Sequence, residues 1–409
     1  MVTSLDTLFS PAEIGPVTIP NRAIRSAAFE GMGKDNNPTD MLRDYHWSVA
    51  AGGVGMTTLA YAGINRSALS FDTQLWLRPE IAPSLRLITD GIHQRGAKAS
   101  IQIGHCGNMT HIKTAGGIPV GASTGFNLYS PTIVRGLGKD ELKMMARDFG
   151  DAVRTARDAG FDCVEVHAGH GYLISQFLSP YTNHRRDEFG GSLDARMRFM
   201  RLCMEEVMKA AGSDMGVLVK TNMRDGFKGG LEIDDCLTVA RELEQLGAHA
   251  LVLSGGFVSK APMYVMRGEM PIVSMTHYMR QWWLKLGVRM VGKYMIPKVP
   301  FKPLYFLEDA RRFRAALSLP LVYVGGVVDG AGIGQVLGEG FEFVQMGRAL
   351  LREPDFINRL RNEASHHCGC EHVNYCIARM YSREMACHCT LPDLPKNIRK
   401  EINRIKEQG

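Results

Sequence analysis

The sequence predicts an α/β fold, a (β/α)8 barrel of the TIM type, with an N-terminal hairpin cap and a C-terminal cysteine-rich extension. Eight short apolar segments, typical of buried parallel strands, alternate with helical patterns along the chain. A doubly wound open sheet would instead require a Gly-x-Gly-x-x-Gly turn after an early strand, and none occurs there. We expect the barrel over residues 1–365 and the extension over residues 366–409.

The elements follow from local patterns. Apolar and polar residues alternate between Leu8 and Arg22 around a Gly-Pro break, which predicts a hairpin at the bottom of the barrel. The strands are expected at 23–28, 56–60, 99–104, 163–166, 217–221, 250–254, 321–324 and 341–346. Helical spacing of apolar residues predicts helices at 41–51, 84–95, 140–159, from Ser192 onward, 233–246, 309–317 and 355–363.

One connection, residues 257–307 after the sixth strand, is unusually long. It is rich in methionine and contains the pair Trp282–Trp283. Long insertions after barrel strands often build substrate pockets, whereas methionine-rich segments also form loose packing or partner surfaces. We expect this insertion to form a pocket wall and an interface.

Composition and charge exclude several classes of protein. The net charge of +6 comes from scattered basic residues, without the basic face or the module that nucleic-acid binding requires. No stretch of about 20 apolar residues predicts a membrane span, and residues 1–20 lack the pattern of a secretory signal. We expect a cytoplasmic homo-oligomer that acts on a small-molecule substrate and binds neither nucleic acid nor membrane.

A polar triplet follows the fourth strand. His167, His170 and Tyr172 lie within six residues, where a barrel strand gives way to a loop. Imidazoles can donate hydrogen bonds to a carbonyl oxygen, and a phenol can supply a proton. The triplet alone leaves two other interpretations open, a surface accident or half of a metal site.

Other residues at the strand ends predict a bound ligand. Gln102 and Lys220 lie in apolar strands, where an amide or a charge needs partners. Gly325-Gly326 and Gly347-Arg348 follow strands seven and eight, the place where such barrels bind phosphate. Small residues end the first strand. Together they indicate a flat, anionic cofactor that lies across the barrel mouth.

The stretch around the triplet is specific enough to indicate a family. It reads His167-x-x-His-Gly-Tyr-Leu-x-x-Gln-Phe-Leu-Ser-Pro180, and then Thr182-Asn-x-Arg-x-Asp-x-Phe-Gly-Gly-Ser-Leu-x-x-Arg196. These thirty residues closely resemble the Old Yellow Enzyme family, the FMN-dependent ene-reductases and dienoyl-CoA reductases. The resemblance covers about residues 5–390.

The resemblance implies an FMN site with NADH or NADPH as hydride donor. By position, Ala27 and Ala28 match backbone contacts to the flavin ring, and Ala60 matches the contact from strand two. Gln102 matches the amide that binds the pyrimidine edge. Lys220 stands where many members have arginine, near N1 and O2 of the ring, and keeps the charge but not the fork geometry.

The same resemblance assigns Gly325, Gly326, Gly347 and Arg348 to the phosphate. It also implies a reaction: His167 and His170 bind the carbonyl oxygen of an enone, enoate or enoyl-CoA, and Tyr172 protonates the α-carbon. Two alternatives stay open, a desaturase or demethylase of a large planar substrate such as a steroid or bile acid, and a non-enzymatic electron carrier.

Five cysteines crowd near the C-terminus: Cys368, Cys370, Cys376, Cys387 and Cys389. Such density suggests zinc or an iron–sulfur cluster. Dienoyl-CoA reductase-like members hold a [4Fe–4S] cluster in a run that begins Cys-x-x-Cys, but here Val373 stands at the second ligand position. The chain also lacks room for the second nucleotide-binding domain of the larger relatives. We therefore expect reduced thiols or a vestige rather than an intact cluster, and no metal ligand.

Overall fold

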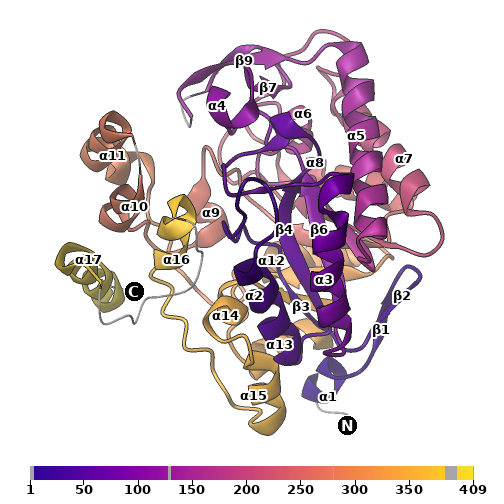
Figure 1. Ribbon diagram of the computed structural model, residues 1–409, viewed down its shortest axis with the longest axis vertical. Helices are drawn as coiled ribbons and strands as arrows, with labels where there is room; N and C mark the ends of the chain where they lie inside the picture. The colour runs from indigo at the N-terminus through magenta and orange to yellow at the C-terminus, as the bar shows by residue number, and fades with distance from the viewer. Residues whose placement is uncertain (1–3, 128–129, 280, 383–393, 409) are drawn as a thin grey trace.

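Eight parallel strands form a closed barrel at the centre of the protein (Figure 1). The computed structural model describes residues 4–127, 130–279, 281–382 and 394–408. The barrel strands are β3 (Ala23–Arg25), β4 (Met56–Gly63), β6 (Lys98–Gly104), β10 (Cys163–His167), β11 (Gly216–Asn222), β12 (Ala250–Ser254), β13 (Leu321–Val324) and β14 (Phe343–Met346). β3 pairs in parallel with both β14 and β4, which closes the ring. The predicted (β/α)8 barrel is confirmed.

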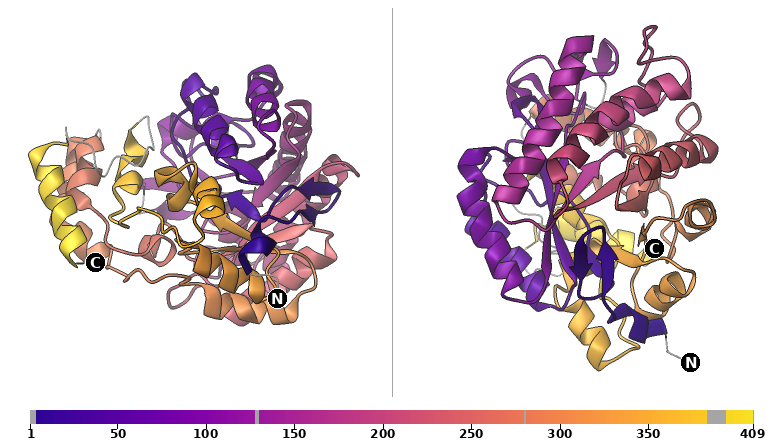
Figure 2. Two further views of the ribbon diagram at one scale, coloured as in Figure 1. Left: turned by 90° about the horizontal axis from the view of Figure 1, so that it is seen from below. Right: turned by 90° about the vertical axis from the view of Figure 1, so that its right-hand side faces the viewer.

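Helices surround this barrel on its outer side (Figure 2). They are α2 (Asp40–Ala51), α3 (Ala82–His93), α5 (Lys139–Asp158), α7 (Leu193–Ala211), α8 (Ile233–Gln245), α12 (Leu307–Ala316), α13 (Gly330–Gly338), α14 (Arg348–Arg352) and α15 (Phe356–Asn362). Ser192 accepts a hydrogen bond from the Ala195 amide and caps α7, as its side chain predicts. The glycine-rich α13 has no counterpart among the predicted helices, because four glycines weaken the helical pattern.

The N-terminal hairpin closes the bottom of the barrel. β1 (Ala12–Ile14) and β2 (Val17–Ile19) pair antiparallel, and Gly15 turns between them at φ +55°. Ile14, Val17 and Ile19 pack against residues from the first half of the barrel strands, among them Ile24 and Met56. The hairpin leaves the carboxyl ends of the strands open for a site, as predicted.

The first and eighth strands are shorter than predicted, and the second runs on to Gly63 rather than ending at residue 60. The first strand ends at Arg25 rather than at residue 28, since the buried Arg25 guanidinium binds Thr58 O at 2.6 Å and Glu30 at 2.6 Å. Glu30 lies in the loop that follows β3, and residues 26–28 leave the strand to form this ion pair. The eighth strand begins at Phe343 rather than at residue 341, because the Glu342 carboxylate turns to the Leu321 amide and Arg314.

The insertion and the extension fold together into a lobe beside the barrel (Figures 1 and 2). The lobe consists of α9 (Pro262–Met266), α10 (Ile272–Tyr278), α11 (Trp282–Met295), α16 (Tyr375–Ala378) and α17 (Lys396–Gln408). Tyr375 and three isoleucines of α17 form a small core with Tyr278. The Glu401 carboxylate accepts hydrogen bonds from the amides of Val273 and Ser274 at the start of α10. A division of the chain near residue 365 stays a prediction.

Smaller elements complete the chain. They are α1 (Ser4–Leu8), β5 (Leu75–Trp76), α4 (Ile112–Ala115), β7 (Val120–Gly121), β8 (Gly125–Asn127), β9 (Thr132–Gly136) and α6 (Leu173–Leu178), with short 3-10 turns at Arg66–Ala68, Pro79–Ile81 and Arg379–Tyr381. β7, β8 and β9 form a separate three-stranded sheet in the connection after β6. Within the described part of the chain, every helix is too short or too polar to cross a membrane.

Candidate active site

The predicted triplet converges at the carboxyl end of β10. The rings of His167 and Tyr172 stack with their centroids 4.2 Å apart, and the ring of His170 meets His167 edge-on at 5.1 Å. His167 is buried, whereas His170 and Tyr172 are half-buried. The three polar side chains therefore form one cluster that borders the open end of the barrel.

A tight turn holds the triplet in this arrangement. His170 adopts φ +58° and Gly171 φ +80°, so the chain reverses between β10 and α6. The Asn222 side chain accepts the His170 amide at 3.0 Å, and the Val258 amide donates to His170 O at 3.0 Å. A Cβ at Gly171 would lie 2.4 Å from the Phe257 ring, which explains the glycine between His170 and Tyr172.

Both imidazoles are neutral at neutral pH. Burial, with a contribution from Lys220, lowers the pKa of His170 to about 3. Burial, together with His170 and Lys220, holds the pKa of His167 well below its ordinary value. The Gly169 amide points to Nδ1 of His167 at 3.4 Å, which favours the tautomer with the ring proton on Nε2. A neutral imidazole offers one N–H donor without adding a charge.

Sequence reasoning missed the residue at the centre of the site, Glu165. Its carboxylate is fully buried and accepts Lys220 Nζ at 2.7 Å, Gln102 Nε2 at 2.6 Å and Gln345 Nε2 at 2.8 Å. Glu165 stands opposite Gln102 on β6, and His167 stands opposite Lys220 on β11. The available signal was a glutamate between two valines, since a charge in a buried strand requires partners. Lys220 thus has the partner that a buried charge needs, and that partner is a side chain.

Three further residues border the triplet without having been predicted. The Tyr61 ring of β4 lies edge-on to Tyr172, with centroids 5.1 Å apart, and its hydroxyl binds Ser70. Ser254, the last residue of β12, has its Oγ 2.7 Å from Nε2 of His170. Asn222 ends β11 and, besides His170, binds Asp225. Each is a polar residue at a strand end, which is the only local signal.

The predicted ring contacts lie at the ends of β3 and β4. Ala27 and Ala28 follow β3, and Ala28 O accepts a hydrogen bond from Arg25 at 3.3 Å. The Ala60 amide donates to the carboxylate of Glu30, at 3.1 and 3.2 Å to its two oxygens. The backbones of Ala28 and Ala60 therefore meet at the Arg25–Glu30 ion pair, and Ala27 directly precedes Ala28.

The glycines predicted to form a phosphate cradle, Gly325, Gly326 and Gly347, follow the adjacent strands β13 and β14. Gly325 and Gly326 adopt φ +137° and +75°, and a Cβ at Gly326 would lie 2.8 Å from Leu304 N. At Gly347 the nearest atom to an added Cβ is 3.9 Å away, so space remains there. Backbone amides at such glycines close on phosphate oxygens in barrels of this class. That these amides bind a phosphate stays a prediction.

Arg348, the predicted cationic partner of that cradle, turns toward the lobe. Its Nη1 donates to Asn374 Oδ1 at 2.9 Å, and the guanidinium lies 5.7 Å from the Phe301 ring centroid. Asn374 in turn donates to Arg267 O at 2.7 Å. Arg348 thus joins the end of β14 to both the insertion and the extension.

The cysteine-rich extension is described only in part. Cys368 Sγ lies 3.7 Å from Ala349 O, and Cys370 Sγ lies 3.7 Å from Nδ1 of His372. Cys376 is buried in α16, whereas Cys387 and Cys389 lie outside the described residues. Among the residues that are described, no three His, Cys, Asp or Glu side chains are placed to share a metal ion.

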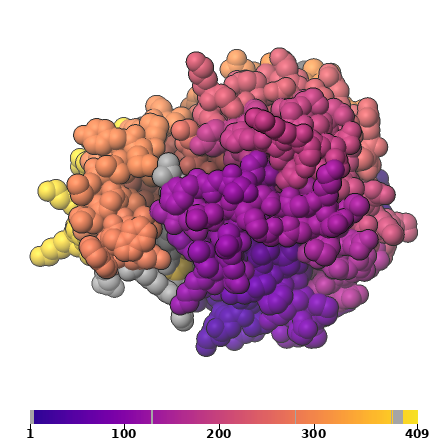
Figure 3. Space-filling model, turned by 90° about the horizontal axis from the view of Figure 1, so that it is seen from above, coloured from indigo at the N-terminus to yellow at the C-terminus, as the bar shows by residue number. Residues whose placement is uncertain are grey.

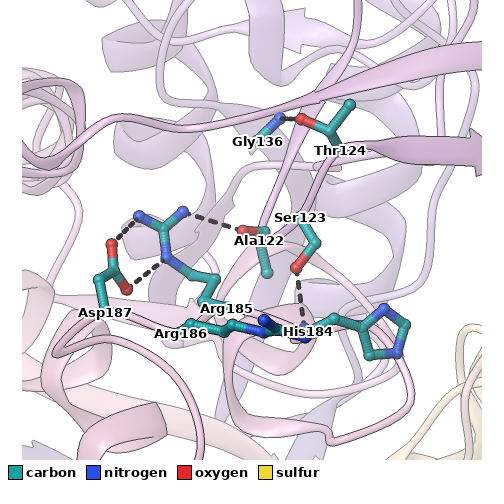
Figure 4. A pocket seen from close by; sticks show the side chains of 8 residues that line it. All are labelled: Ala122, Ser123, Thr124, Gly136, His184, Arg185, Arg186 and Asp187. Carbon is teal, nitrogen blue, oxygen red and sulfur yellow. Dashed lines mark hydrogen bonds and ion pairs between the residues drawn. The ribbon is translucent and has the colours of Figure 1, made fainter.

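A separate hollow of about 440 Å³ lies beside the small sheet and contains none of the triplet (Figure 4). Ala122, Ser123, Thr124, Gly136 and residues 184–187 line it. Arg185 and Asp187 of the long sequence motif pair here at 2.6 Å, and Arg185 also donates to Ala122 O and Leu137 O. The conspicuous Arg–Asp part of the motif therefore ties loops together at a distance from the triplet in the fold.

Comparison with known proteins identifies the family. Residues 7–299 match the model of the NADH:flavin oxidoreductase / NADH oxidase family. A 4,4'-dithiodibutanoate disulfide reductase of Rhodococcus erythropolis is 38% identical over 377 residues, which cover 92% of this chain and 93% of that protein. An NADPH dehydrogenase of Listeria monocytogenes is 34% identical over 265 residues, 63% of this chain and 76% of that protein.

Solved structures share the fold. A 2-naphthoyl-CoA reductase complex superimposes with a TM-score of 0.79 at 20% identity, over 98% of this chain. The chain spans 58% of the length of that reductase. The Old Yellow Enzyme homologue of Zymomonas mobilis gives a TM-score of 0.71 at 22% identity, over 90% of this chain and 96% of that one. The chain belongs to the NADH:flavin oxidoreductase / NADH oxidase family, that of Old Yellow Enzyme, and is an FMN-dependent oxidoreductase with a nicotinamide nucleotide as its reductant.

Proposed function

We propose that this enzyme reduces the C=C bond of an α,β-unsaturated carbonyl compound. The observation that carries the proposal is the stacked His167–Tyr172 pair, 4.2 Å between centroids, with His170 edge-on to it. Two neutral imidazoles and a phenol in one cluster match the needs of this reaction, a pair of donors for an oxygen and an acid for a carbon.

The barrel mouth would hold the FMN. The glycines at 325, 326 and 347 would bind its phosphate, Gln102 and Lys220 the pyrimidine edge of its ring, and the segments at Ala27, Ala28 and Ala60 the ring itself. Arg348 would contact the phosphate once its hydrogen bond to Asn374 is broken. When bound, the flavin supplies the hydride that it has accepted from NADH or NADPH, and the protein orients and polarises the substrate.

His167 and His170 would bind the carbonyl oxygen. The Gly169 amide occupies Nδ1 of His167 and leaves the Nε2 proton for the substrate. For His170 to donate from Nδ1, the Ser254 hydroxyl must donate to its Nε2, to which it lies at 2.7 Å. Because both rings are neutral, the negative charge that develops on the oxygen is stabilised by dipoles already in place.

Tyr172 would give its phenolic proton to the α-carbon. A phenol of pKa about 10 is a weak acid, so its contribution should be moderate, roughly 10²- to 10⁴-fold. Tyr61 and His167 pack against its ring and restrict the direction in which its hydroxyl points.

The Tyr172→Phe variant tests the assignment. Its enone-dependent turnover should fall by about 10²- to 10⁴-fold, because the acid is gone. Its FMN content and its rate of flavin reduction by NADH should stay the same, since neither uses the phenol. Stopped-flow measurement of the two half-reactions separates these effects. Tyr181→Phe, which removes an exposed hydroxyl, is the matched control. Loss of FMN or of flavin reduction in Tyr172→Phe would contradict the role.

An organic disulfide is the second candidate substrate, because a relative with 38% identity is a disulfide reductase. One hydride and one proton convert a disulfide into two thiols, so the same acid could serve the leaving sulfur. Parallel turnover with cyclohexenone and with 4,4'-dithiodibutanoate discriminates the two. If the disulfide is turned over much faster than cyclohexenone, the disulfide becomes the favoured substrate and the enone is rejected.

A further inference from the structure

Helix α11 presents large apolar side chains to solvent. Tyr294 is 88% exposed, Trp282 75% and Met290 69%, and Trp283 and Leu286 are about half exposed. In the space-filling view the surrounding segment, drawn in orange, covers much of the lobe, and yellow atoms of the C-terminal segment project beyond it (Figure 3). Monomeric proteins rarely expose contiguous apolar patches of this kind without a partner.

The sequence of α11 sorts into four rows at a spacing of four residues. One row packs inward: Gly292 lies against Ile272 of α10, and Val288 and Ile296 join the apolar cluster there. Two adjacent rows are apolar and exposed. They contain Trp282, Leu286, Met290 and Tyr294 in the first, and Trp283, Gly287, Val291 and Met295 in the second. The fourth row is basic.

That basic row is Lys285, Arg289 and Lys293, and it flanks the apolar rows along the helix. Arg289 also donates to Thr276 Oγ1 at 3.0 Å, which fixes the orientation of this side of the helix. Residues 270–307 contain six lysines and arginines and no aspartate or glutamate. The sequence around α11 is therefore cationic, with aromatic and aliphatic residues at its centre.

The residue composition of the exposed face of α11 distinguishes two binding partners, a second copy of the chain and an anionic surface. A second copy would bring the basic row close to its own counterpart, and like charges at an interface oppose association. An anionic surface would meet the same charges favourably. Tryptophan and tyrosine beside lysine and arginine on an amphipathic helix are typical of helices that lie in a membrane interface.

We propose that α11 docks flat on an anionic lipid surface. The two apolar rows would enter the headgroup region, and Lys285, Arg289 and Lys293 would contact lipid phosphates. Since the helix runs only from Trp282 to Met295, it would lie on the bilayer rather than span it. This inference goes beyond the proposed function and departs from the expectation of no membrane partner, which rested on the absence of a long apolar stretch.

The lobe would transmit this attachment to the barrel. Asn374 of the extension binds Arg348 at the end of β14, and the Phe301 ring stacks on His372 with centroids 3.6 Å apart. Docking would thus hold the barrel at the membrane surface through residues 299–307 and 367–378. It would change where the enzyme works and leave the triplet untouched.

Vesicle co-sedimentation of the full-length, FMN-loaded protein tests the proposal. Vesicles of phosphatidylcholine with phosphatidylglycerol should bind the protein at low salt, release it at high salt, and shift the tryptophan fluorescence to the blue. Vesicles of phosphatidylcholine alone should bind it far less. The triple variant Trp282→Ala/Leu286→Ala/Met290→Ala and the double variant Lys285→Gln/Lys293→Gln should each lose about tenfold or more in partitioning.

The matched control is Phe126→Ser/Ile133→Ser, which removes two exposed apolar side chains from β8 and β9. It should bind vesicles like the wild type. All variants should keep the wild-type turnover in solution, which verifies their folding. No sedimentation with either vesicle would overturn the proposal, as would equal binding to both. A wild-type dimer that the triple variant converts to monomer, without vesicle binding, would assign the face to a second copy instead.

Discussion

The barrel mouth buries charged side chains, whereas the lobe exposes large apolar side chains to solvent. At the mouth, Glu165 and Lys220 are fully buried and paired at 2.7 Å, and two glutamines complete the carboxylate shell. On α11, Trp282 and Tyr294 are among the most exposed large side chains described. The mouth encloses charges that burial would penalise, and each has a partner. The lobe exposes apolar surface that burial would favour, and none of the residues that the structure describes covers it.

The two regions should therefore differ in how strongly a substitution changes the free energy of unfolding. Fixed charges and neutral imidazoles at the mouth are held in place by neighbouring strands, which suits a site that must not rearrange during a reaction. The lobe has a small core of its own around Tyr375 and Ile398, while its outer face is exposed to solvent. The first region should therefore be sensitive to any polar substitution, and the second tolerant.

Glu165→Ala should have the largest effect on stability. It leaves the Lys220 ammonium buried without its carboxylate, and breaking a buried ion pair in this way costs about 3–5 kcal/mol. Urea unfolding measures the loss. Glu188→Ala, which breaks the exposed pair with Lys139, is the control and should change little. Glu165→Met/Lys220→Met should recover part of the stability. A loss in Glu165→Ala no greater than in the control would show that the mouth tolerates unpaired charge.

The mouth was only partly predictable from the sequence. His167, His170, Tyr172 and the paired glycines follow strand ends, so their convergence was expected from the fold class alone. Glu165 was missed because its partners come from β6, β11 and β14, and the strand register that unites them is not local information.

The lobe was less predictable still. The segment 257–307 was recognised as unusual, but three of the four rows of α11 are apolar, so the pattern does not say which row packs inward. The neighbour that decides this is Ile272 against Gly292, a tertiary contact. The turn of Arg348 toward Asn374 depends on the lobe in the same way.

Gly326→Ala should have an intermediate effect and release FMN. Its φ of +75° costs a side chain roughly 1–3 kcal/mol, and the added Cβ would also press on Leu304 N at 2.8 Å. Gly191→Ala is the matched control, because its φ is +82° and no atom lies within 4 Å of its Cβ. Flavin fluorescence after gel filtration should fall for Gly326→Ala only. Equal flavin retention in both variants would remove Gly326 from the phosphate cradle.

The buried histidines should make the free energy of unfolding depend on pH. Burial lowers the folded-state pKa of His105 and of His170 to about 3, while the unfolded value is about 6.5. Below pH 6.5 the unfolded chain binds protons that the folded chain excludes. The free energy of unfolding therefore decreases as the pH is lowered, by up to about 1.4 kcal/mol per pH unit for each group. His105→Gln should flatten the slope of unfolding free energy between pH 6 and 4. Identical slopes would contradict the depressed pKa.

The most direct test of the account is an anaerobic absorption spectrum of the purified protein with NADH and then with cyclohexenone. We predict flavin bands that NADH bleaches and that the enone restores in one turnover. A bleached flavin that ignores cyclohexenone but is reoxidised by 4,4'-dithiodibutanoate would contradict the enone proposal and favour the disulfide. A colourless protein that cannot be reconstituted with FMN would contradict the cofactor site itself.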